Sequence, residues 1–168
     1  MRKLLLDTKK MVTLSVLVAI AMILSYIEFL LPISTAIPGM KIGLSNIATV
    51  FTLYTLGWPY AIFVSIIRVI LSSLIFGSFV SFLYSLSGAA FALLIMIILK
   101  KTNLFSSIGV SVSGGVFHNV GQIVAACIVM NSVEISLYLI PLVISGTISG
   151  IFIGLVSGML VEKIKKYI

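Results

Sequence analysis

The stretch FVSFLYSLSGAAFALLIMIIL, residues 79–99, is followed directly by Lys100 and Lys101. It contains no charged residue. An α-helix needs about 20 predominantly apolar residues to cross the hydrocarbon core of a bilayer. This stretch has that length, and a lysine pair is typical of the point where a helix leaves the membrane. Residues 79–99 therefore predict a membrane-spanning helix.

The rest of the chain has the same character. Of its 168 residues, 61% are hydrophobic and 9% are charged, and the mean hydropathy is +1.31. A water-soluble domain needs a larger charged fraction to cover its surface. We therefore expect an all-α integral membrane protein, a bundle of six transmembrane helices in a single domain, 1–168. The expected helices are roughly 11–31, 41–56, 60–76, 79–99, 108–130 and 137–161.

The second of these segments, 41–56, is short for a full span, so we expect it to be tilted or broken. Pro32 and Pro38 bracket the connection that precedes it, because proline breaks helices and restricts the residue before it. The pattern predicts a non-helical link on one side of the membrane.

The chain has a net charge of +7, and most of its basic residues lie at the ends of the apolar runs. The basic clusters lie at the start of the chain, after the fourth segment and after the sixth, at Arg2, Lys3, Lys9, Lys10, Lys100, Lys101, Lys163, Lys165 and Lys166. In a six-helix topology these positions share one side, which the positive-inside rule assigns to the cytoplasm. We therefore expect both termini in the cytoplasm, contacts with anionic membrane lipid, and no binding of nucleic acid.

Arg68 lies near the middle of the third segment. A charge at the bilayer centre costs several kcal/mol, so this side chain should face the bundle interior and have a partner. Two partners fit: Glu28 in a structural ion pair, or the anionic group of a ligand, which a guanidinium holds through two hydrogen bonds. Ser72 lies one turn beyond Arg68 and adds a hydroxyl.

Three polar residues, His118, Asn119 and Gln122, fall within little more than one turn of the fifth segment. His118 and Gln122 share a face because they are four residues apart. Polar side chains midway along a span need partners, so this cluster favours a polar cavity over pure packing. No second histidine or carboxylate lies at metal-ligand spacing, so no metal site is expected.

The run PGMKIGLSN, residues 38–46, places a turn, Lys41 and Asn46 at the start of the second segment. Backbone N–H groups at a helix start favour an anion. The alternative is a surface turn with a lysine that reaches to the interface. We expect a pocket for an anionic ligand, and its candidate residues are Glu28, Lys41, Asn46, Arg68, Ser72, His118, Asn119 and Gln122.

Small residues recur at every fourth position of the sixth segment, at Gly146, Gly150, Gly154 and Gly158. Such a row lets another helix backbone approach closely. The row therefore predicts either packing within the bundle or a surface for a partner membrane protein. In the first segment, Ser15, Ala19 and Ala21 are candidates for the same two roles.

Several quoted runs together resemble a family of small bacterial membrane proteins. They are Ile27-Glu28, PGMKIGLSNI at 38–47, Leu56-Gly57-Trp58, and Arg68 with Gly77. The family is the Gx transporter family, also named heptaprenyl diphosphate synthase component I, and it is similar to the substrate-binding S components of energy-coupling factor transporters. This resemblance implies a six-helix protein of the bacterial cytoplasmic membrane. It also implies a micronutrient ligand, flavin-like or isoprenoid- and quinone-related, and partners in a transmembrane coupling protein and ATPase subunits.

The synthase name conflicts with the residues. Prenyl transfer needs carboxylates that hold magnesium against a diphosphate. The four carboxylates here, Asp7, Glu28, Glu134 and Glu162, are far apart in the sequence. We therefore expect no enzyme and no cofactor, but a substrate-capture subunit. Two alternatives are a non-catalytic accessory subunit of an isoprenoid or redox system, and a carrier driven by a proton gradient through His118.

Overall fold

The structure, a computed structural model, describes residues 2–31 and 43–165, with side chains for 8–31 and 43–164. These ranges contain six α-helices and one short 3-10 helix, and no strand. The elements are α1 (Arg2–Leu30), α3 (Asn46–Thr55), α4 (Trp58–Phe76), α5 (Phe79–Thr102), α6 (Ser107–Met130), η1 (Glu134–Tyr138) and α7 (Leu139–Lys165). The predicted all-α fold of six helices is confirmed.

Five segments of the described chain are long and apolar enough to cross a membrane. The exception is α3, whose ten residues extend for only about 15 Å, half of a hydrocarbon core about 30 Å thick. The chain is thus a multi-pass membrane protein with one short internal helix. The short second segment was predicted, although α3 begins at Asn46 rather than at residue 41, which lies outside the described residues.

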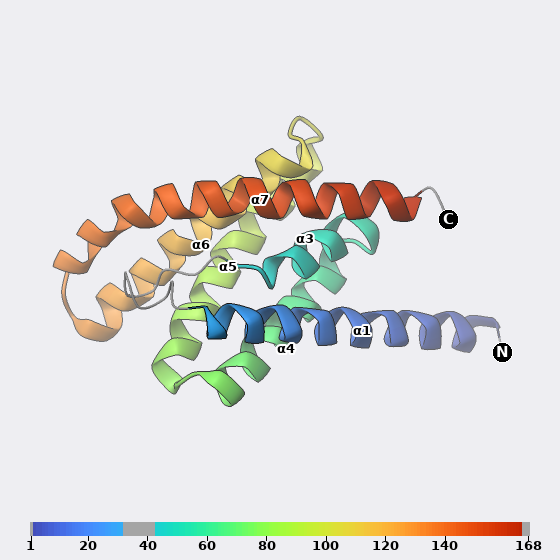
Figure 1. Cartoon of the computed structure of the whole chain (residues 1–168), viewed down its shortest axis with the longest axis horizontal. Helices are drawn as coiled ribbons and strands as arrows, with labels where there is room; N and C mark the ends of the chain where they lie inside the picture. Colours follow the sequence, from blue (N-terminus) through green and yellow to red (C-terminus); the bar gives the residue numbers. More distant parts are fainter. Residues whose placement is uncertain (1, 32–42, 166–168) are drawn as a thin grey trace.

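The start of α1 and the end of α7 lie at the same end of the bundle, and the connection from α6 to α7 lies at the other end (Figure 1). Two lysines lie over aromatic rings at the start of α4, with Lys10 Nζ 5.7 Å from the Tyr60 ring centre and Lys101 Nζ 5.9 Å from that of Trp58. Lys100 also donates a hydrogen bond to the carbonyl of Leu53 at the end of α3. That the basic clusters share one side of the membrane stays a prediction.

The helices pack in two groups. The most extensive contacts join α6 to α5 and α7, and smaller ones join α1, α3 and α4. The short α3 lies between α1 and α7 (Figure 1) and connects the groups. Its side chains Val50, Thr52 and Leu53 are at most 1% exposed. Because α3 is buried on nearly every side, residues at its start lie inside the bundle.

Helix ends are capped by short polar side chains. Ser78 precedes α5, and its hydroxyl accepts a hydrogen bond from Ser81 N at 3.2 Å. We expect Ser78→Ala to lower the free energy of unfolding by about 1 kcal/mol, and Ser78→Gly by only a few tenths, since glycine is a tolerated cap. Thermal unfolding in detergent measures both, and equal effects of the two changes would contradict this role of the hydroxyl.

Candidate functional site

The start of α3 is tied to the end of α1. Gly43 has a φ of +73°, a conformation that glycine adopts without strain. Its N–H donates to Glu28 Oε1 at 2.5 Å, and its carbonyl accepts from Asn46 N at 2.8 Å. A carboxylate from α1 thus holds the turn that begins α3 and fixes the position of Asn46.

Arg68 reaches this turn from α4. Its side chain is only 8% exposed, and Nη2 donates to Asn46 Oδ1 at 3.0 Å. Nε is buried and has no hydrogen-bond acceptor among the described residues. The negative charge of Glu28 acts on the guanidinium. Glu28, Asn46 and Arg68 therefore form one polar network that links α1, α3 and α4.

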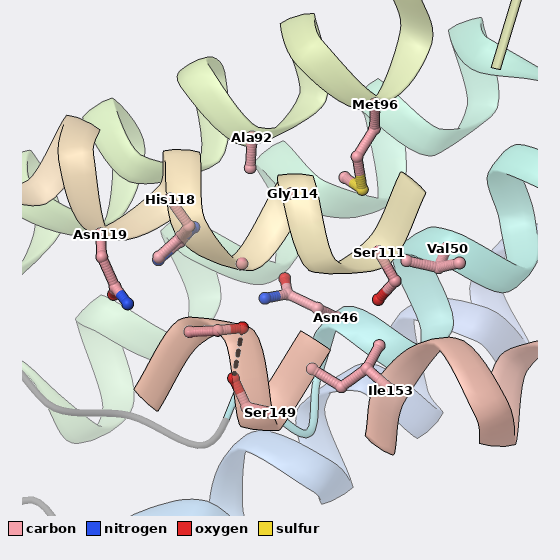
Figure 2. Close-up of a pocket in the computed structure, with 12 residues that line it drawn as sticks. Asn46, Val50, Ala92, Met96, Ser111, Gly114, His118, Asn119, Ser149 and Ile153 are labelled. Atoms are coloured by element: carbon pink, nitrogen blue, oxygen red, sulfur yellow. Dashed lines mark hydrogen bonds between the residues drawn. The ribbon is translucent and has the colours of Figure 1, made fainter. Parts of the chain in front are cut away.

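On its other side, Asn46 borders a small cavity between α3, α5, α6 and α7. The volume is about 30 Å³, which is room for about one or two water molecules. His118 and Asn119 from α6 and Ser149 from α7 also line it (Figure 2). Asn119 Nδ2 donates to the carbonyl of Leu142 at 2.5 Å, so this amide also fastens α6 to α7. The cavity has several polar groups in a mostly apolar lining, and it is too small for an organic ligand in this conformation.

A larger cavity of about 310 Å³ lies beside η1. Gln122 lines it, four residues beyond His118, together with Tyr84 and Tyr138, which the sequence analysis did not select. Tyr84 has the only phenol in the apolar run 79–99, and that single phenol was the available signal. Volumes above about 300 Å³ are typical of small-molecule sites.

The structure thus divides the predicted ligand residues. Glu28, Asn46 and Arg68 meet in the polar network, and His118 and Asn119 join it across the small cavity. Gln122 belongs to the larger cavity. The Ser72 hydroxyl donates to the Val69 carbonyl of its own helix at 3.3 Å and lines neither of these cavities. Lys41 lies outside the described residues.

The glycine row of α7 faces α6. A Cβ added at Gly150 would lie 2.6 Å from Val112 Cα, and one at Gly154 would lie 2.7 Å from Ile108 Cα. At Gly146 and Gly158 the nearest atoms likewise belong to α6 residues. Of the two roles predicted for the row, this geometry supports packing within the bundle and not a partner surface, because α6 already covers that face.

The small residues of α1 have two different environments. Ser15 and Ala19 are exposed, whereas Ala21 is fully buried. Ser15 and Ala19 are four residues apart and share a face, which large exposed side chains such as Val12, Val16 and Ile23 surround. Ser15 and Ala19 stay candidates for contact with a partner helix. Ala21 is not part of that surface, because its side chain is buried.

Within residues 8–31 and 43–164, no three His, Cys, Asp or Glu side chains come together in a group that could hold a metal ion.

A family model described as heptaprenyl diphosphate synthase component I matches residues 17–160. No curated protein and no solved structure matched the chain.

Proposed function

The chain belongs to the family of heptaprenyl diphosphate synthase component I. We propose that it acts as a non-catalytic membrane subunit that captures a small anionic molecule for transport. In this proposal the basic end, which contains both termini, is in the cytoplasm of a bacterium. The capture site then opens toward the outer face, where α1 ends and α3 begins. A coupling protein and ATPase subunits supply the energy.

The observation that carries this proposal is the state of Arg68. A guanidinium inside a membrane bundle costs several kcal/mol unless it is paired. Here one nitrogen donates to a neutral amide, and buried Nε has no acceptor among the described residues. The nearby carboxylate of Glu28 is itself engaged by Gly43 N. A carboxylate or phosphate of a ligand would supply the missing acceptor. A guanidinium binds both of these groups well.

Two further features support an anion at this place. The start of α3 lies beside Arg68, and the dipole of a helix favours negative charge near its N-terminus. Lys41 is close in sequence to this start and is proposed to add a second cation. His118 and Asn119 would orient the remainder of the ligand if the small cavity widens on binding. Flavin-like and isoprenoid- or quinone-related anions are the ligand classes that we propose.

The family description favours a second candidate function. A component of heptaprenyl diphosphate synthase would be an accessory subunit that holds a soluble prenyl-chain enzyme at the membrane. In that case the exposed basic clusters at the ends of α1, α5 and α7, which include Lys10 and Lys101, would contact the enzyme.

Native mass spectrometry of the protein, purified gently from its own membranes, separates the two functions. We expect a bound small anion, identified by its mass, together with coupling and ATPase subunits. Recovery of an empty protein with a prenyl-chain enzyme would reject the capture proposal in favour of the accessory subunit.

A further inference from the structure

Two lysines from neighbouring helices lie at the start of α4. Lys10 of α1 lies over the Tyr60 ring, and Lys101 of α5 lies over the Trp58 ring. Each of these four residues falls within the first or last turn of an apolar segment long enough to cross a membrane. Aromatic rings and lysines in such positions lie at the membrane–water interface. The two ammonium groups are therefore at the level of the lipid headgroups.

The surface of α4 between these two lysines is exposed and apolar. Successive residues of an α-helix are roughly 100° apart, so Trp58 and Tyr60 point to opposite sides of α4 and Pro59 points between them. The two lysines thus approach α4 from different sides. Exposed apolar residues follow this face along the helix at helical spacing. They form the α4 strip, which consists of Pro59, Phe63, Ile66, Ile70 and Leu74.

This arrangement matches the parts of one class of lipid. A membrane phospholipid has an anionic phosphate at the interface and acyl chains below it, and basic sites between membrane helices bind such headgroups. Because the two ammonium groups lie on different sides of α4, a headgroup with two linked phosphates can pair with both, whereas a lipid with one phosphate pairs with one. The exposed α4 strip begins between the lysines and provides an apolar surface for acyl chains.

We propose that the start of α4 is a binding site for diphosphatidylglycerol (cardiolipin), whose two phosphates pair with Lys10 and Lys101 and whose acyl chains lie along the α4 strip. The rings of Trp58 and Tyr60 hold the two lysines in place at the interface. The charge pattern of the sequence indicated anionic lipid in general, and the packing of α1, α4 and α5 assigns the place and the headgroup. The proposal stands whether or not Arg68 binds an anion.

The test uses the fluorescence of Trp58, which is the only tryptophan of the chain. Bromine in an acyl chain quenches a tryptophan that it contacts. The full-length protein is placed in vesicles of dioleoylphosphatidylcholine that contain brominated cardiolipin, brominated phosphatidylglycerol or brominated phosphatidylcholine at matched mole fractions. Each lysine near a lipid phosphate contributes about 1 kcal/mol, a factor of about five. We therefore expect cardiolipin to bind beside Trp58 about 25-fold more strongly than phosphatidylcholine, and phosphatidylglycerol about fivefold. Quenching that depends only on the mole fraction, whatever the headgroup, would overturn the proposal.

Variants then locate the phosphates. Lys10→Met and Lys101→Met should each weaken cardiolipin binding about fivefold, to the level of phosphatidylglycerol, and Lys101→Arg should keep the binding because it keeps the charge. Lys163→Met is the matched control, since it removes the same charge from an exposed lysine of α7. An equal loss in Lys163→Met would show general attraction of charge and would overturn the site. The comparison of headgroups in the parent protein needs no variant, so it decides the matter even if one variant fails to fold.

Two results separate this site from the proposed functions. Arg68→Ala should leave the preference for cardiolipin unchanged, because Arg68 is buried and bonded to Asn46 at the start of α3. Loss of the preference in a folded Arg68→Ala protein would overturn the separate site. If the two lysines served only to contact a soluble enzyme, the purified protein would show no preference among headgroups, which would also overturn it. Failure to recover a small anion from native membranes would reject the capture function and leave the quenching result as it is.

Discussion

Gly150→Val should abolish the folded bundle. A Cβ at Gly150 lies 2.6 Å from Val112 Cα and 3.0 Å from the Ser111 carbonyl oxygen, both of them backbone atoms that no rotamer change can move. Overpacking typically costs about 1–3 kcal/mol, and we expect that range for Gly150→Ala. Valine adds two further methyl groups at the same point, so α6 and α7 would have to separate along their length. Thermal unfolding and size-exclusion chromatography in detergent measure the effect.

Gly109→Ala is the matched control on α6. The atom nearest to a Cβ there is Phe105 Cδ1 at 3.5 Å, an ordinary contact with a side chain. Alanine is also favoured over glycine in a helix by about 1 kcal/mol. We therefore expect unchanged or slightly higher stability for Gly109→Ala. A Gly150→Val protein as stable as the parent would show that α6 and α7 do not pack as described.

Arg68→Ala should lower the affinity for the captured anion by about tenfold to a hundredfold. A hydrogen bond to a charged group contributes about 1.5–3 kcal/mol, and each 1.4 kcal/mol is a factor of ten. The protein should stay folded and monodisperse. Arg68 is bonded to Asn46 at the start of α3, and removing its side chain leaves the contacts of α6 with α5 and α7 in place. The bound fraction of the molecule recovered from the parent protein, read by native mass spectrometry, is the measurement.

Two other variants define what the guanidinium contributes. Arg68→Lys keeps the charge but loses the two-pronged geometry, so we expect an intermediate affinity. Glu134→Gln also changes one charge, on an exposed side chain of η1, and should leave the affinity unchanged. Wild-type affinity in a folded Arg68→Ala protein would remove this residue from the site.

Much of the fold could be predicted because hydropathy is local. The apolar run 79–99 and its closing lysines placed α5 to within a few residues, and Pro32 follows closely on the end of α1 at Leu30. The shortness of the second segment indicated that it does not span as the others do. The polar residues at 118, 119 and 122 were likewise found as buried or cavity-lining positions, since polar groups in a span need partners.

The sequence by itself determined that this is a multi-pass helical membrane protein with polar residues inside its bundle, since each span is apolar over its own length. Tertiary structure alone decided which of those residues meet. Arg68 bonds to Asn46, Gln122 turns to a different cavity from His118, and Gly150 packs on α6. The reason is physical: periodicity shows which residues share a face of one helix. The neighbour of that face depends on the rotation and depth of every other helix in the bundle.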